Sequence, residues 1–158
     1  MNMEHLITDR TASDVERWRE LHDKGFAAMN SAERAEWLGY MKGRYTSEDM
    51  NRVESAVESI QRAFAEFGYP YPSLTIKTSW ERSECPTVED IERYFSNVAK
   101  MREAIPVSKD TPKAPTVNTK LDYRKANDLE KILVAVAGSI TNMPKAWYYA
   151  GDIISGEV

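Results

Sequence analysis

The spacing of apolar residues along most of the chain is that of amphipathic helices. The clearest run lies between Asp49 and Gly68, where apolar residues alternate three and four positions apart. The run is Met50, Val53, Val57, Ile60, Phe64 and Phe67. This spacing lines up one face of a helix, and Gly68 followed by Pro70 ends it. We predict a helix here that forms the centre of the core, because it carries six large apolar side chains.

Four other stretches have helical spacing. They are Val15, Trp18 and Leu21; Trp37, Leu38 and Met41 after Asn30; Ile91, Tyr94, Phe95, Val98, Met101 and Ile105; and Leu129, Ile132, Leu133, Val136 and Ile140. Pro106 ends the third of these, and we expect the last to end near Asn142 and Pro144. The sequence therefore predicts a mainly α fold of about five helices, packed as a bundle or as stacked helical hairpins.

A recurring string marks the helix starts. It has Thr, then Asp three residues later, then an apolar residue, and it occurs at Thr11–Asp14, Thr46–Asp49 and Thr87–Asp90, with a degenerate fourth copy at 125–131 around Asp128. Such a Thr and Asp form a capping box, and the acid also suits the positive end of the helix dipole. The Asn30–Glu33 pair predicts a further capping box. We interpret the four strings as a decayed duplication, although four independently capped helices would look the same.

Three segments fall outside this helical pattern. Residues 68–86 are irregular, with three prolines and a run from Leu74 to Trp80 that is typical of an edge strand. Residues 106–119 are rich in proline and predict an exposed linker or docking arm. We assign residues 1–145 to a helical domain that contains both segments. Residues 146–158 form an aromatic tail for which we expect a short β element.

Composition and charge narrow the classes of partner. The 158 residues are 42% hydrophobic and 29% charged, with a net charge of −4 and basic residues interspersed among acids. We therefore expect no nucleic-acid partner, because no basic stripe could neutralise phosphates. We also expect no membrane partner, signal peptide or transmembrane segment. The single cysteine, Cys85, excludes an internal disulfide and fits synthesis in a reducing cytoplasm.

No catalytic or ligand-binding motif is present. The two histidines, His5 and His22, have no partner at metal-ligand spacing, and the seven glycines form no phosphate-binding string. The recurrent aspartates are explained by helix starts, and the arginines that follow them, Arg17, Arg52 and Arg93, by salt-bridged helix faces. We predict no catalytic residues, no cofactor, no metal and no enzymatic activity.

The remaining candidate surface is aromatic. It comprises Tyr69, Tyr71, Trp80, Trp147, Tyr148 and Tyr149. Aromatic residues are enriched in protein interfaces, where they bury large areas at low entropic cost. Folding back of Trp147 and one tyrosine onto the bundle is an equal alternative.

Several segments together resemble a known group of proteins. They are residues 6–11, 29–37, 41–43, 49–54 and 146–152, the last being Ala146-Trp147-Tyr148-Tyr149-Ala150-Gly151-Asp152. Over nearly the whole chain they are similar to structural proteins, associated with the tail or baseplate, of bacteriophages and prophages of gut Gram-positive bacteria. The resemblance implies a virion component that contacts other virion proteins and itself, as a homo-oligomer. The alternative is a soluble phage-encoded adaptor or regulatory module that binds a host or phage protein.

Overall fold

The protein is described by a computed structural model that covers residues 3–118 and 120–154, with side chains as far as Met143 in the last helix. It contains five α-helices, namely α1 (Ala12–Lys24), α2 (Ser31–Leu38), α3 (Ser47–Glu66), α4 (Val88–Glu103) and α5 (Tyr123–Ile154), with a 3₁₀ turn at Phe26–Ala28. The described residues contain no strand. The predicted mainly α fold of about five helices is confirmed.

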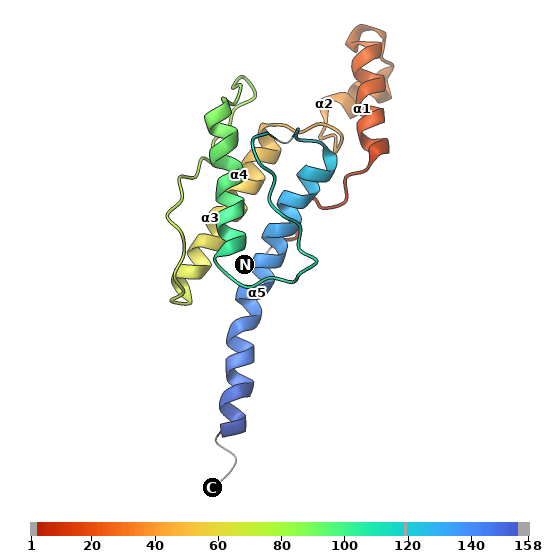
Figure 1. Cartoon of the computed structure of the whole chain (residues 1–158). Helices are drawn as coiled ribbons and strands as arrows, with labels where there is room; N and C mark the ends of the chain where they lie inside the picture. The colour runs from red at the N-terminus through yellow and green to blue at the C-terminus, as the bar shows by residue number, and fades with distance from the viewer. Residues whose placement is uncertain (1–2, 119, 155–158) are drawn as a thin grey trace.

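The body of the molecule is a bundle of α3, α4 and α5 (Figure 1). Its core contains the apolar face of each helix: Met50, Val53, Val57, Ile60 and Phe64 of α3, Tyr94, Phe95, Val98 and Met101 of α4, and Leu129, Ile132, Leu133, Val136 and Ile140 of α5. Phe67 differs from the prediction, since it is 49% exposed as the C-cap of α3. Gly68 then adopts φ +70°, a left-handed conformation that glycine tolerates and that ends the helix.

The helices α1, α2 and α4 begin at complete capping boxes, as predicted. The side chains of Thr11, Asn30 and Thr87 accept a hydrogen bond from the N–H three residues later, and the acid there accepts from the cap. At the start of α3, Asp49 Oδ2 accepts from Thr46 N at 2.7 Å.

The fourth predicted cap, within residues 125–131, is wrong. Helix α5 begins earlier, and Asp122 Oδ1 accepts from Lys125 N at 2.9 Å. Aspartate is a strong N-cap residue, so the helix starts there and places Asp128 inside it. Whether the three remaining Thr-x-x-Asp strings are a duplication stays a hypothesis.

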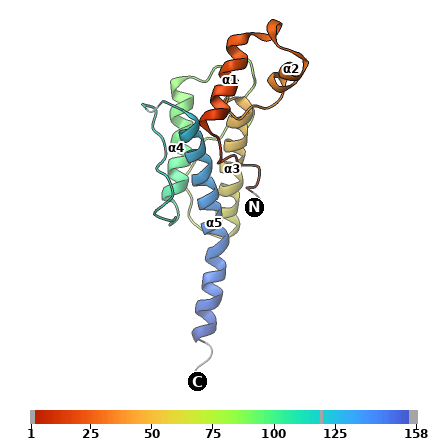
Figure 2. The same ribbon diagram turned by 90° about the vertical axis from the view of Figure 1, so that its right-hand side faces the viewer.

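Helices α1 and α2 form a hairpin beside one end of the body (Figures 1 and 2). It has a small core of its own, made of Leu21, Met29 and Met41, with Trp18 and Trp37 packed around it. The loop back to α3 passes close to α1 at Gly43, where an added Cβ would lie 2.0 Å from the carbonyl oxygen of Asp14. Glycine is therefore required at this crossing.

Most of the described residues of the proline-rich segment 106–119 are exposed, as predicted, but the segment is attached to the chain's own body at a few points. Thr111 and Pro115 are buried. Arg102 of α4 donates hydrogen bonds to the carbonyl oxygens of Pro112 at 2.7 Å and Thr111 at 3.2 Å. An arginine at the end of a helix can satisfy the carbonyls of a long loop, and this holds the segment in place. Residue 119 lies outside the described residues.

Helix α5 continues through Pro144 to Ile154, so the predicted stop near Asn142 and Pro144 is wrong. The short β element expected in 146–158 is also wrong as far as Ile154, and residues 155–158 lie outside the described part of the chain. Proline removes one backbone hydrogen bond, which disfavours a helix without forbidding it. Beyond the body, α5 projects alone (Figures 1 and 2). The division at residue 145 stays a prediction, and it falls inside a continuous helix.

Candidate functional site

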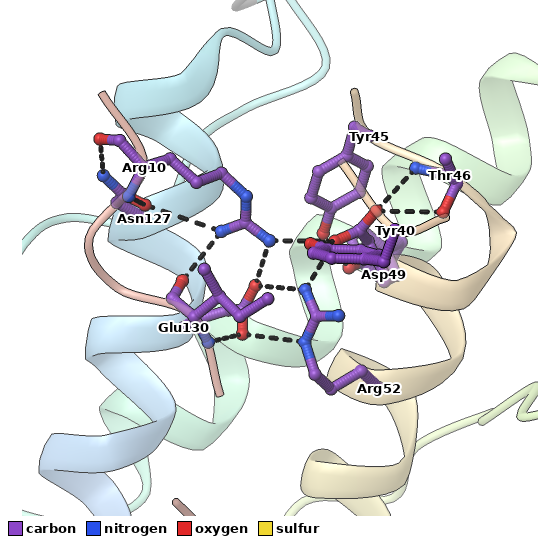
Figure 3. A network of polar contacts seen from close by, with 10 residues as sticks. Arg10, Tyr40, Tyr45, Thr46, Asp49, Arg52, Asn127 and Glu130 are labelled. Carbon is purple, nitrogen blue, oxygen red and sulfur yellow. Dashed lines mark hydrogen bonds and ion pairs between the residues drawn. The ribbon is translucent and has the colours of Figure 1, made fainter. Parts of the chain in front are cut away.

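Among the residues whose side chains are described, a group of buried charged side chains lies inside the body, between α3, α5 and the segment before α1. Arg10 comes from that segment, Asp49 and Arg52 from the first turns of α3, and Glu130 from α5 (Figure 3). The side chains of Asp49 and Glu130 are fully buried, and that of Arg10 is 2% exposed. We call these four residues the central network.

The charges of the central network balance. Arg10 Nη2 lies 2.9 Å from Asp49 Oδ1 and 2.7 Å from Glu130 Oε1. Arg52 Nη2 lies 2.9 Å from the same Glu130 oxygen and also pairs with Asp49. Two guanidinium groups thus face two carboxylates, which is what makes burial of the charges tolerable.

Neighbouring groups complete the hydrogen bonding around Arg10. Asn127 of α5 accepts from Arg10 N at 3.0 Å and donates to Arg10 O at 2.9 Å, so its amide pairs with the backbone as a neighbouring strand would. Ile7 N donates to Glu130 Oε2, and Arg10 Nη1 donates to Ile7 O at 2.7 Å. These bonds attach the N-terminal segment to α5.

Two tyrosines extend the network. The guanidinium of Arg10 lies 5.6 Å from the ring centre of Tyr45, and that of Arg52 lies 5.7 Å from the ring centre of Tyr40 (Figure 3). Tyr40 Oη donates to Asp49 at 2.7 Å. Burial by itself would raise the pKa of Asp49, but the hydrogen bonds from Tyr40 and Arg52 outweigh it, and the pKa is lowered. Asp49 is therefore held in its ionised form.

A second buried acid lies on α3, facing α4. Glu54 is 1% exposed, and its Oε1 lies 2.7 Å from Arg93 Nη2, while its Oε2 accepts from Lys77 N at 3.2 Å. Arg17 of α1 likewise pairs with Glu36 of α2 at 2.7 Å. The prediction that Arg17, Arg52 and Arg93 serve salt-bridged helix faces is confirmed, since each pairs with an acid on another helix.

The six residues of the predicted aromatic surface do not form one surface. Trp80 is buried in the core, with its backbone bonded to Asn51 on both sides, so its assignment to a surface is wrong. It is buried because residues 69–80 lie against α3 and α4 as an irregular segment instead of an exposed strand. Tyr69 is half-buried against the core and Tyr71 is 46% exposed. Trp147, Tyr148 and Tyr149 lie in the projecting part of α5, among residues whose side chains are not described.

Two open clefts accompany these groups. One, of about 350 Å³, lies between the start of α3 and residues 80–86, and includes Arg44, Ser47 and Trp80 in its lining. The other, of about 410 Å³, lies between α1, the loop around Gly43 and the start of α5. The described residues contain no group of three side chains suited to hold a metal ion. In the second cleft Arg10 and Lys42 are already paired with carboxylates.

The role of the central network is therefore structural, because it joins the N-terminal segment to α3 and α5. Sequence reasoning explained Asp49 as a helix start and missed the pairing with Arg10 and Glu130. A signal was present, because Glu130 shares a helical face with the apolar positions Ala126 and Leu133. A charged residue on such a face needs a partner of opposite charge.

Comparisons with known proteins add no family: no family model, no curated protein and no solved structure matches the chain. In the described part of the chain, none of the helices combines the length and the apolar character that crossing a bilayer requires.

Proposed function

We propose that the protein is a structural component of a bacteriophage virion, in the tail or baseplate, which works through protein–protein contacts without catalysis. The observation that carries the proposal is the last part of α5, which leaves the body as a single helix with no other described element beside it (Figures 1 and 2). A helix in that position is suited to reach a neighbouring subunit. The same residues belong to the segment 146–152, which resembles tail-associated proteins.

The arrangement of charges supports a non-catalytic role. Catalytic acids and bases need a reactive group that faces a pocket and can exchange a proton. The buried acids Asp49, Glu130 and Glu54 are instead neutralised by arginines of the same chain. Their surroundings favour a rigid scaffold, which suits a part that has to present the same surface in every copy of an assembly.

The test is the presence of the protein in purified phage particles, measured by quantitative mass spectrometry. A virion component should appear at a fixed ratio to the other tail proteins. Removing residues 144–158 should lower that ratio, because the projecting helix makes the contact. The protein could instead be abundant in infected cells, bound to a host or phage protein and missing from particles. It would then be an adaptor, and the virion proposal would be wrong.

A further inference from the structure

The projecting part of α5 lacks the support that holds the other helices. We call residues 144–154 the arm; they are the last 11 of the 32 residues of α5. The arm continues a helix that is already formed inside the body, but Pro144 and Gly151 lower its helix propensity, and packing supplies most of the stability of protein helices. In both views of the molecule no other described element lies beside it. A contact from outside the chain would therefore stabilise the arm.

The sequence spacing shows where that contact belongs. Inside the body, Leu129, Leu133, Val136 and Ile140 lie four and three residues apart and are completely buried. The same alternation continues as Met143, Trp147, Ala150 and Ile154. These positions lie on one line along α5, which we call the stripe. Helices α3 and α4 cover the first half of the stripe. Nothing described covers the second half.

The charges of the arm point to an uncharged partner. The arm has two charged residues, Lys145 and Asp152, and at 100° per residue both lie roughly opposite the stripe. The positions that flank the stripe are uncharged: Pro144, Ala146, Gly151 and Ile153. In paired helices, charges at the flanking positions select partner and orientation. A partner that is selected by its charge would need charged residues at these flanking positions of the arm. A second copy of the arm has the same uncharged flanking positions, so the two arms would not repel each other.

The body determines the orientation. In a parallel pair, the stripe of each α5 would face the other copy along its whole length, where α3 and α4 already lie. The two bodies would occupy the same space. In an antiparallel pair the bodies lie at opposite ends and only the arms overlap. This register places position 147 opposite position 150 of the second copy and position 143 opposite position 154, so that a large residue and a small one are paired in the middle of the contact.

An additional surface lies where the tip of the second arm would arrive. Helix α3 ends at the level where the arm leaves the body (Figures 1 and 2). The residues at and after that end include two exposed aromatics, Phe67 at 49% and Tyr71 at 46%. We propose that the arm binds antiparallel to the arm of a second copy of this chain, and that its tip packs against Phe67 and Tyr71. A two-fold axis relates the copies, and each contact is made twice.

This inference goes beyond the proposed function and stands whether or not the chain enters a virion. The first test is the molar mass of the full chain by light scattering, from low to high micromolar concentration. We expect a reversible dimer. Ala150→Glu places a charge on the stripe and should weaken dimerisation at least tenfold. Lys145→Glu also adds a carboxylate, but off the stripe, and serves as the control. A chain that stays monomeric, or two variants that behave alike, would overturn the proposal.

Cysteine cross-linking tests the orientation. In a Cys85→Ser background, which removes the exposed native thiol, one chain carries Met143→Cys and another carries Ile154→Cys. After mixing and mild oxidation, an antiparallel pair should give the mixed disulfide between the two chains. Disulfides between identical chains would indicate a parallel pair and contradict the geometry. Circular dichroism of each variant shows that the bodies remain folded.

Discussion

Replacing Arg10 with methionine tests the central network most directly. Methionine is also unbranched and of similar length, and the side chain of Arg10 is 98% buried. The change removes one of the two positive charges of the central network. Asp49 and Glu130 would then share Arg52 alone, which leaves one buried negative charge without a partner. The hydrogen bond from Arg10 to the carbonyl oxygen of Ile7 would also be lost. The N-terminal segment should loosen from α5.

The size of the effect follows from these contacts. Removing one partner of a buried ion pair costs about 3–5 kcal/mol, because the other charge stays behind. The whole domain should have a free energy of unfolding of about 5–15 kcal/mol, so the loss is a large share of it. For a domain of this size each kcal/mol shifts Tm by about 2–4 °C, which predicts a fall in Tm of about 6–20 °C.

The assay is thermal and urea unfolding followed by circular dichroism, with Arg17→Met as the matched control. Arg17 pairs with Glu36 at 2.7 Å, the same distance as Arg10 with Glu130, but both side chains are about 40% exposed. Its loss should cost at most about 1 kcal/mol. Adding Glu130→Gln to Arg10→Met should restore part of the stability, because it removes the excess charge. If Arg10→Met and Arg17→Met destabilise equally, the assignment of the network as a buried structural element is refuted.

Three further predictions concern other parts of the chain. Gly43→Ala should separate the α1–α2 hairpin from the body, because the new Cβ would meet the backbone of Asp14; hydrogen exchange should accelerate in α1 and α2 while α3 stays protected. Gly138→Ala should stabilise the protein by about 0.5–1 kcal/mol in urea unfolding, since the site is helical with no atom near the added methyl. The pKa of Asp49 is lower in the folded protein than in the unfolded chain, so ionised Asp49 stabilises the fold. This stabilisation is complete above the unfolded-state pKa of about 3.9 and is lost as the pH falls through the folded-state pKa. Asp49→Asn should therefore flatten the acid branch of a plot of urea midpoint against pH.

The features that the sequence predicted correctly are local. A capping box joins residues three apart, so Thr11–Asp14 and Thr87–Asp90 could be recognised without knowing the fold. The apolar run from Met50 to Phe64 predicted α3 and its buried face for the same reason, because helical periodicity orders neighbours on a single helix.

The features that the sequence did not predict depend on contacts between distant segments. Trp80 was expected on a surface because it follows a proline-rich stretch, and it is buried because Asn51 of α3 binds its backbone. The linker after Pro106 is mostly exposed, as expected, but its attachment to the chain's own body through Arg102 was not predicted. Its composition is typical of a solvated segment, and no local pattern shows that one helix carries the donors that satisfy its carbonyls.

By itself, then, the sequence determined that the chain is helical, where α1 to α4 begin, and the apolar faces that α3, α4 and α5 bury in the body. Only the tertiary structure decided which charges meet. Arg10 and Glu130 are 120 residues apart, and folding places them in one buried network. The tertiary structure also shows that α5 extends beyond the body. The first half of its stripe packs against α3 and α4, and the second half lies past the ends of these helices. Helix formation depends on residues three and four apart, whereas burial depends on which segments are brought together from the whole chain.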